Sequence, residues 1–309
     1  MKKVTVIGAG FVGATAAQRL AEKELADVVL IDVLEGIPAG KALDMVESAP
    51  VERFDAKVTG STADYAPMEG SEVVIITAGI ARKPGMSRDD LFKTNRDIVN
   101  GVCENVKKYA PNSVILMVTN PLDLMAYTAF KTTGFSSDRV IGMAGVLDSA
   151  RFAAFVGMEL GVSVKDISAM VLGGHGDTMV PMPRFTTVGG IPITELLPKE
   201  TIDRISQRAR DGGAEIVKLL KTGSAYYAPS SSVVAMAEAI LLGKDRLLPA
   251  SVYLRGEYGY EGFYLGVPAV IGAGGLKRVI QIKLNDEEKA GLDKSANAVK
   301  TQMAEVGLA

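Results

Sequence analysis

The sequence predicts an α/β fold, with a doubly wound parallel sheet in the first half and an α+β domain in the second. In residues 1–143, short runs rich in Val and Ile alternate with segments of helical periodicity, which is the pattern of βαβ units. In residues 144–309, strand candidates that look antiparallel are interspersed with longer helical stretches. We expect two domains that meet near residue 143, where the pattern changes.

The elements of the first half are predicted from these alternating runs. Because helices cover both faces of a doubly wound sheet, its strands are continuous apolar runs, and its ligands bind at the carboxyl ends of the strands. Strands are expected at Val4–Ile7, Val28–Ile31, Val73–Thr77, Val114–Val118 and Val140–Ile141, and helices at Phe11–Lys23, Ile37–Ser48 and Leu91–Tyr109.

The second half is predicted to contain three helices, at Asp148–Leu160, Ile202–Lys221 and Asp286–Val306. Gly212 and Gly213 should kink or divide the second of these, since each glycine costs about 1 kcal/mol inside a helix. Strands are expected at Ile167–Leu172, Ser251–Gly256, Pro268–Ile271 and Val279–Lys283.

Composition excludes several classes of protein. The 309 residues are enough for two domains with substantial cores, and 34 basic against 36 acidic residues indicate no nucleic-acid or membrane surface. Cys103 is the only cysteine, which excludes an internal disulfide and a multi-thiolate metal site and fits a reducing compartment. No apolar run is long enough to span a membrane, and the run after Lys3 breaks at Gly8, too early for a secretion signal. We therefore expect a cytoplasmic protein.

A dinucleotide site is predicted at the first strand–helix turn, Gly8-Ala-Gly-Phe-Val-Gly13. Gly8 makes the tight turn, Gly10 lets the backbone approach a pyrophosphate, and Gly13 permits close helix–strand packing. The second strand ends in Asp32, whose carboxylate can accept both ribose hydroxyls and repels a 2′-phosphate, which favours NAD over NADP. The first domain is therefore expected to be of the Rossmann type.

His175 is the only histidine, and it lies among glycines in Leu172-Gly-Gly-His-Gly-Asp177. With an ordinary pKa of roughly 6.5, histidine can give and take a proton near neutral pH. Asp148 and Arg151 share one face of a predicted helix, a spacing that by itself most often means a surface ion pair.

Arg82 and Arg88 follow the third predicted strand, with a turn at Pro84-Gly85 between them. The segment is either a solvated basic loop or a mobile loop that carries two guanidinium groups over the ligand crevice. Asn120 ends the next strand at the same edge of the sheet, where its amide could contact nicotinamide or substrate.

Together these motifs resemble the lactate/malate dehydrogenase family over the whole chain. The matching motifs are Gly8-Ala-Gly-Phe-Val-Gly13, Asp32, the Arg82–Arg88 segment, Thr119-Asn120-Pro121, Asp148-Ser-Ala-Arg151 and Gly174-His175-Gly-Asp177. The overall sequence is similar to the malate dehydrogenases of the lactate dehydrogenase-like type, a mostly bacterial and archaeal group.

The resemblance implies a role for each residue. His175 would be the acid/base, Asp148 would orient its imidazole, and Arg88 would polarise the C2 carbonyl. Arg151 would bind the C1 carboxylate and Asn120 the substrate near the same carbonyl oxygen. The cofactor NAD would be bound by Gly8, Ala9, Gly10, Phe11, Val12, Gly13, Asp32, Asn95, Val118, Thr119 and Asn120, and no metal is expected.

Arg82 would decide the substrate, because the matching position of lactate dehydrogenases typically carries glutamine. A buried guanidinium favours a dicarboxylate such as malate or oxaloacetate over pyruvate. The alternatives are a lactate or other 2-hydroxyacid dehydrogenase, an NAD-dependent glycosidase with a metal, and a non-catalytic NAD sensor. The family also implies a homo-oligomer, with a tetramer favoured over a dimer and an apolar stripe on Ile37–Ser48 as a candidate contact.

Overall fold

The computed structural model describes residues 1–80 and 88–308, with the backbone alone described for Arg88 and Asp89. Within these residues a nine-stranded sheet has the order β14-β13-β12-β6-β5-β4-β1-β2-β3. Six of its strands run parallel to one another: β1 (Lys3–Ile7), β2 (Asp27–Asp32), β3 (Val58–Thr62), β4 (Val73–Ile76), β5 (Val114–Met117) and β6 (Val140–Gly142). The order reverses at β1, as the prediction of a doubly wound sheet requires.

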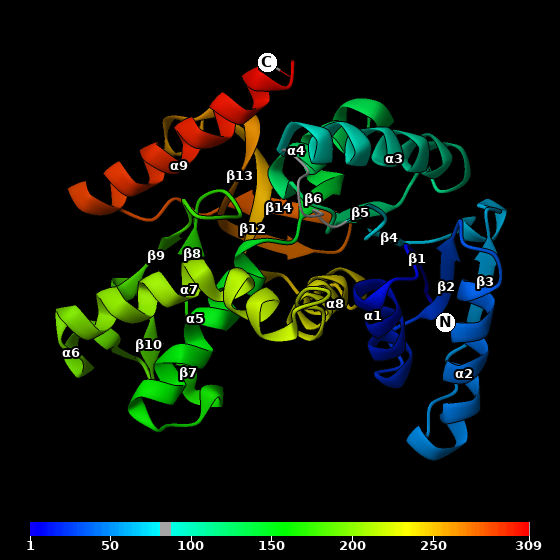
Figure 1. Ribbon diagram of the computed structural model, residues 1–309, viewed down its shortest axis with the longest axis horizontal. Helices are drawn as coiled ribbons and strands as arrows, with labels where there is room; N and C mark the ends of the chain where they lie inside the picture. Colours follow the sequence, from blue (N-terminus) through cyan, green and yellow to red (C-terminus); the bar gives the residue numbers. More distant parts are fainter. Residues whose placement is uncertain (81–87, 309) are drawn as a thin grey trace.

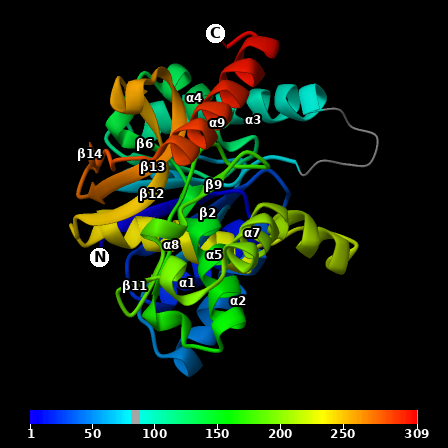
Figure 2. The same cartoon turned by 90° about the vertical axis from the view of Figure 1, so that its left-hand side faces the viewer.

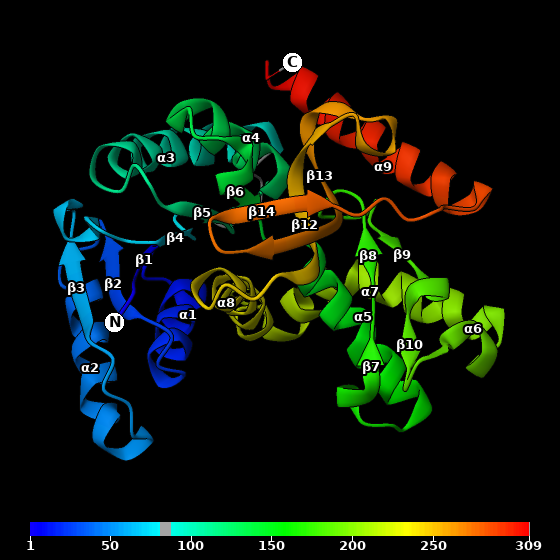
Figure 3. The same cartoon turned by 180° about the vertical axis from the view of Figure 1, so that it is seen from behind.

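Helices cover both faces of the parallel strands (Figure 1). The helices α1 (Phe11–Glu22) and α2 (Ile37–Glu52) lie on one face, and α3 (Arg88–Tyr109) and α4 (Leu122–Thr133) lie on the other (Figure 3). Both faces of these strands are therefore buried: β4 is a continuous run of Val and Ile, and β1 contains Val4, Val6 and Ile7, all with little or no solvent exposure. The predicted fold class is confirmed.

The second half of the chain extends the same sheet. Ser251 of β12 lies opposite Gly142 of β6 in antiparallel register, so the sheet continues across the predicted boundary at residue 143. The added strands are β12 (Arg246–Arg255), β13 (Glu261–Gly272) and β14 (Gly275–Val279). The helices of this half are α5 (Gly145–Leu160), α6 (Ile193–Leu196), α7 (Lys199–Leu220), α8 (Tyr227–Leu241) and α9 (Asp286–Glu305).

Short elements complete the second half. A small three-stranded sheet contains β7 (Ile167–Ser168), β10 (Thr187–Val188) and β11 (Ile191–Pro192), and a two-stranded ladder pairs β8 (Val171–Leu172) with β9 (Val180–Pro181). Single 3-10 turns lie at Ala66–Met68, Ser137–Arg139, Val164–Asp166, Pro183–Phe185 and Glu257–Gly259. Figure 2 shows α9 crossing beside α4 and β13, against which it packs.

Three predictions for the second half are wrong. The strand expected at Ile167–Leu172 is two strands, β7 and β8, which belong to different sheets. The strand expected at Val279–Lys283 lies earlier in the chain, because β14 spans Gly275–Val279 and ends where the expected strand begins. Gly212 and Gly213 do not divide α7, which is a single helix from Lys199 to Leu220. Within residues 1–80 and 88–308, no helix combines the length and apolar character needed to cross a membrane.

Candidate active site

The glycine-rich turn after β1 has the geometry of an anion site. Gly8 has a φ of +105°, and a Cβ atom on Gly13 would lie only 1.8 Å from the Gly8 carbonyl oxygen, so α1 can begin this close to β1 only with glycine at position 13. No side chain of the described residues caps α1 at Gly10. The N–H groups of its first turn are therefore available to a pyrophosphate, which also meets the positive end of the helix dipole.

Asp32 lies beside this turn at the end of β2. Its Oδ2 accepts a hydrogen bond of 2.6 Å from the Ala9 N–H, and its Oδ1 accepts one of 3.0 Å from the Leu34 N–H. A carboxylate has about four lone-pair sites, so acceptor capacity remains for two ribose hydroxyls. Lys41 of α2, which the sequence analysis did not single out, donates to the Ala9 carbonyl at 2.6 Å.

The segments that follow β4 and β5 are tied to each other through Asn95 of α3. Its amide nitrogen donates to the Asn120 carbonyl at 2.7 Å, and its Oδ1 accepts the Ile80 N–H at 2.8 Å. Thr119 adds a hydrogen bond of 2.7 Å to the Ala78 carbonyl. Asn95 is buried and its amide bonds protein backbone, so it holds the carboxyl edge together, and its contact with a cofactor stays a prediction.

His175, Asp148 and Arg151 lie together on the second half of the chain. His175 Nδ1 is 2.9 Å from Asp148 Oδ2, and Arg151 Nη1 is 3.5 Å from Asp148 Oδ1. The first turn of α5 carries Asp148, and Arg151 follows one turn later on the same face. With Nδ1–H donated to the carboxylate, the neutral imidazole has Nε2 free to accept a proton.

The electrostatics of this group follow from burial and from its carboxylates. Burial lowers the pKa of His175, but the charges of Asp148 and Asp123 outweigh it, so the net pKa is raised above the ordinary value. Burial lowers the pKa of Arg151, and Asp148 opposes this. Cys103 does not compete with His175 near neutral pH, because burial raises its pKa to about 12.

One nitrogen of Arg151 lacks a hydrogen-bond acceptor among the described residues. The Arg151 side chain is only 12% exposed, and its Nε is buried without a hydrogen-bond partner among the described residues. A buried guanidinium N–H without an acceptor is costly, and a ligand carboxylate would relieve that cost.

A cavity of about 610 Å³ opens in front of His175. Its lining includes Asn120 and Pro121 after β5, Leu91 and Phe92 of α3, and residues of α9 such as Gln302. The structure therefore brings Asn120 and His175 to one cavity. Arg82 lies outside the described residues, and the side chain of Arg88, at the start of α3, is not described.

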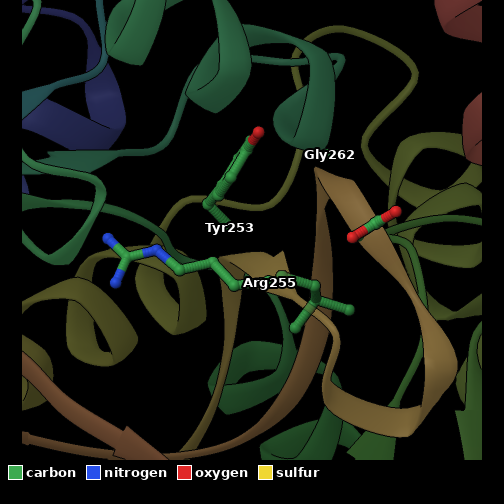
Figure 4. A pocket seen from close by; sticks show the side chains of 5 residues that line it. Tyr253, Arg255 and Gly262 are labelled. Atoms are coloured by element: carbon green, nitrogen blue, oxygen red, sulfur yellow. The ribbon is translucent and has the colours of Figure 1, made fainter.

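A second hollow, of about 530 Å³, lies at the end of the β12–β13 hairpin. Figure 4 shows the Arg255 side chain extending away from Gly262, and its guanidinium bonds the Ser137 hydroxyl at 2.5 Å. None of the residues that line this hollow belongs to the predicted site, and its charged groups do not converge on a common point.

The sequence analysis missed three polar residues near His175. Asp123 of α4 accepts the His175 N–H, Ser295 of α9 accepts the Gly174 N–H, and Ser251 of β12 donates to Asp123. Asp123 carried a detectable signal, because a carboxylate in Asn120-Pro-Leu-Asp123 directly follows a buried strand at the ligand edge. The two serines carried none, since isolated serines are common on helices and strands.

Comparison with known proteins matches both halves of the chain. Residues 2–142 match the family model of the lactate/malate dehydrogenase NAD binding domain, and residues 145–307 match that of the lactate/malate dehydrogenase alpha/beta C-terminal domain. Malate dehydrogenase from Bacillus subtilis is 57% identical over 304 residues, which are 98% of this chain and 97% of the relative.

Solved structures of two activities are similar to this one. Apo malate dehydrogenase from Picrophilus torridus has a TM-score of 0.96 at 46% identity, covering 99% of this chain and 97% of that one. Lactate dehydrogenase from Cryptosporidium parvum, complexed with lactic acid and nicotinamide adenine dinucleotide, also has a TM-score of 0.96, at 42% identity, covering 100% and 98%. With both domain models matched over nearly its full length, the chain belongs to the lactate/malate dehydrogenase family.

Proposed function

We propose that this chain catalyses the reversible NAD-dependent oxidation of (S)-malate to oxaloacetate, a reaction of the tricarboxylic acid cycle. The observation that carries the proposal is the hydrogen-bonded His175–Asp148 pair, with Arg151 beside it, whose buried Nε has no partner among the described residues. An acid/base next to a buried cation suits a substrate that has a hydroxyl group next to a carboxylate. The malate dehydrogenase activity named for its relatives, at 57% identity for the one from Bacillus subtilis, supports this substrate class.

In the forward direction, Nε2 of neutral His175 accepts the hydroxyl proton of malate while the C2–H bond breaks and its electron pair leaves with the hydrogen. Bound NAD supplies the nicotinamide carbon that accepts this hydride. The carboxylate of Asp148 stabilises the imidazolium, and positioned proton transfer of this kind contributes roughly 10²–10⁴-fold in rate. In the reverse direction, protonated His175 returns its proton to the keto oxygen of oxaloacetate.

The other site residues bind the substrate and the cofactor and polarise the C2 carbonyl. Arg151 binds the C1 carboxylate, Asn120 bonds the substrate near C2, and Arg88 stabilises the charge that develops on the C2 oxygen. The turn from Gly8 to Gly13 cradles the pyrophosphate, and Asp32 selects NAD by accepting ribose hydroxyls. Asn95, Val118 and Thr119 complete the cofactor site as proposed contacts.

Arg82 separates this proposal from a lactate dehydrogenase, since the fold is equally similar to solved structures of both activities. A guanidinium at this position is paired by the second carboxylate of oxaloacetate and left unpaired by pyruvate. Polar sites of this kind discriminate between two such substrates by roughly 10²–10⁴-fold in kcat/KM.

Initial rates with oxaloacetate and with pyruvate, each with NADH and with NADPH, test the proposal. We expect oxaloacetate with NADH to give the highest kcat/KM. A preference for pyruvate would contradict the argument from Arg82, and a preference for NADPH the argument from Asp32. A variant His175→Asn that binds NADH yet loses the reaction separates an enzyme from an NAD sensor, whereas an undiminished rate would refute the acid/base role.

The cellular location, the oligomeric state and the domain division of the enzyme are also proposals. A single cysteine supports a cytoplasmic location. A subunit contact is supported by the apolar stripe of α2, on which Leu43 is 59% exposed and Val46 is 42% exposed, and the resemblance to the lactate dehydrogenase-like group favours a homotetramer over a dimer. The division into a dinucleotide-binding domain of residues 1–143 and a catalytic domain of residues 144–309 is proposed on the same sequence pattern.

A further inference from the structure

The side chain of Lys41 reaches the glycine-rich turn from a neighbouring βαβ unit. Lys41 lies near the beginning of α2, which follows β2, whereas the turn follows β1. Its Nζ donates a hydrogen bond of 2.6 Å to the Ala9 carbonyl and lies 5.8 Å from the centroid of the Phe11 ring. Because Ala9 and Phe11 flank Gly10, the two contacts place the ammonium beside the residue at which α1 begins.

The backbone of Ala9 is held by charged groups at both of its polar atoms. Its N–H donates to Asp32 Oδ2 at 2.6 Å, and its carbonyl accepts the bond of the same length from Lys41. Ala9 is buried, so both bonds lie at the edge of the core. Hydrogen bonds to ionised groups are stronger than those between neutral groups, so the ammonium is firmly placed against the turn.

The ammonium of Lys41 has no carboxylate partner among the described residues. It has three N–H donors, of which the bond to Ala9 uses one. Asp32 does not pair with it, because the Asp32 oxygens accept the N–H groups of Ala9 and Leu34. The first turn of α1 contains no acidic residue either. A full positive charge and the positive end of a helix dipole therefore lie side by side, an arrangement that favours a negatively charged ligand.

The turn is closed towards the sheet and open where the ammonium lies. A Cβ atom on Gly8 would lie 2.6 Å from Thr77 Oγ1, whereas one on Gly10 would meet no atom within 4 Å. Phe11, the next residue, is 68% exposed. The open side of Gly10 therefore leaves room for a ligand next to Lys41.

We propose that Lys41 is a cofactor-binding residue that acts on the phosphate groups of NAD. The inference rests on the cofactor of the proposed function. The bond to Ala9 and the contact with Phe11 hold the ammonium beside the first N–H groups of α1, so that its charge and the helix dipole act together on a diphosphate. A lysine ammonium is a compact point charge that suits this task. Lys41 thereby adds affinity for the phosphates, while Asp32 accepts the ribose hydroxyls.

Two substitutions separate the charge of Lys41 from its contact with the turn. Lys41→Gln removes the charge and keeps an N–H donor for the Ala9 carbonyl, whereas Lys41→Arg keeps the charge. The matched control is Lys57→Gln. It removes the same charge from an exposed lysine that precedes β3, and in a parallel sheet this position lies at the edge opposite to the turn after β1.

Adenosine, AMP and ADP carry no, one and two phosphates on the same nucleoside, so their dissociation constants separate phosphate binding from ribose and adenine binding. The full chain is titrated with NADH by its fluorescence, and the three ligands are measured by displacement of NADH, without divalent cations and without turnover. We expect Lys41→Gln to raise the Kd of NADH and ADP by on the order of 10-fold, that of AMP by less, and that of adenosine by less than about two-fold.

The control variants should behave differently. Lys41→Arg should keep the Kd of every ligand within about three-fold of the parent, because the charge remains. Lys57→Gln should leave all of them unchanged. Because salt screens the ammonium, the difference in Kd for ADP between the parent and Lys41→Gln should shrink as the ionic strength rises.

Two results would overturn the inference. Equal Kd values for ADP in the parent and in Lys41→Gln would exclude a contribution of the charge, and an equal rise for adenosine, AMP and ADP would show that Lys41 acts only through the shape of the turn. If Lys41→Gln does not fold, Lys41→Met applies the same test, since it also removes the charge and keeps an apolar side chain against Phe11. A parent chain that binds NADH but does not reduce oxaloacetate would refute the proposed reaction instead, and the three ligands would still decide the role of Lys41.

Discussion

Substitution of Gly212 by alanine should weaken substrate binding although it strengthens the helix that contains it. Gly212 of α7 faces Arg151, and a Cβ atom at this position would lie 3.2 Å from Arg151 Cδ. Ordinary contacts between carbon atoms begin near 3.5 Å, so the arginine must shift by a few tenths of an ångström. The shift displaces the guanidinium that is proposed to bind the C1 carboxylate.

The expected size of the effect follows from these distances. If a misplacement of 1 Å costs on the order of 10²-fold, a shift of a few tenths of an ångström should cost roughly 3- to 10-fold in kcat/KM for oxaloacetate. Most of this loss should appear in KM, because Arg151 contacts the carboxylate and not the reacting C2 atom. The KM for NADH should not change.

The next residue provides a matched control. A Cβ atom on Gly213 would lie 3.8 Å from both terminal nitrogens of Arg151, which is an ordinary contact. Gly213→Ala should therefore leave kcat/KM within about two-fold of the parent, because the guanidinium does not have to move. It should raise the free energy of unfolding by up to about 1 kcal/mol, the usual gain of alanine over glycine in a helix.

Steady-state kinetics and thermal unfolding of the two variants measure these effects side by side. The reasoning requires that Gly212→Ala raise the KM for oxaloacetate above that of Gly213→Ala. Equal KM values in the two variants would refute it, since the helix propensities of the two substitutions are the same.

Three further predictions concern pH, cofactor and substrate. The pKa of His175 is raised, so the midpoint of the pH profile of kcat/KM should lie above about 6.5. As pH increases through this midpoint, kcat/KM for oxaloacetate reduction should fall and that for malate oxidation should rise. A midpoint below about 6.5 would contradict the direction of the pKa shift. The same shift means that the stability conferred by protonated His175 is complete below the ordinary pKa and is lost as pH rises through the folded-state pKa. Asp32→Asn should raise the KM for NADH and reduce the preference for NADH over NADPH. An unchanged ratio of kcat/KM for the two cofactors would show that Asp32 does not select between them. Arg82→Gln should move the ratio of kcat/KM for oxaloacetate over pyruvate towards pyruvate by on the order of 10²-fold, and an unmoved ratio would contradict its role in specificity.

The fold of the first half was largely predictable because its signals are local. The strand β1, the turn from Gly8 to Gly13 and Asp32 at the end of β2 follow one another within a single βαβ unit. The helices α4 and α8 escaped prediction for a physical reason: both are buried on nearly every side, so neither has the polar face that reveals a helix by its periodicity. The strand β3 escaped because Thr59, Gly60 and Ser61 make it polar.

The candidate site was likewise predictable from the sequence only in part. From the sequence alone come the residue types that carry the chemistry: one histidine, a carboxylate and an arginine on one helix face, and a glycine-rich turn followed by Asp32. Resemblance to a family then assigned their roles. Arg82, on which the choice of substrate depends, is likewise an argument from sequence.

Only the tertiary structure decided how these residues are held. The bond between Asp123 and His175 spans 52 residues of chain, and that between Asp123 and Ser251 spans 128. Gly212, predicted to kink or divide a helix, lies inside the undivided α7 and leaves room for Arg151. Local patterns report on neighbours within a turn or a strand, whereas these contacts exist only because the packed sheet and helices bring distant segments within hydrogen-bond distance.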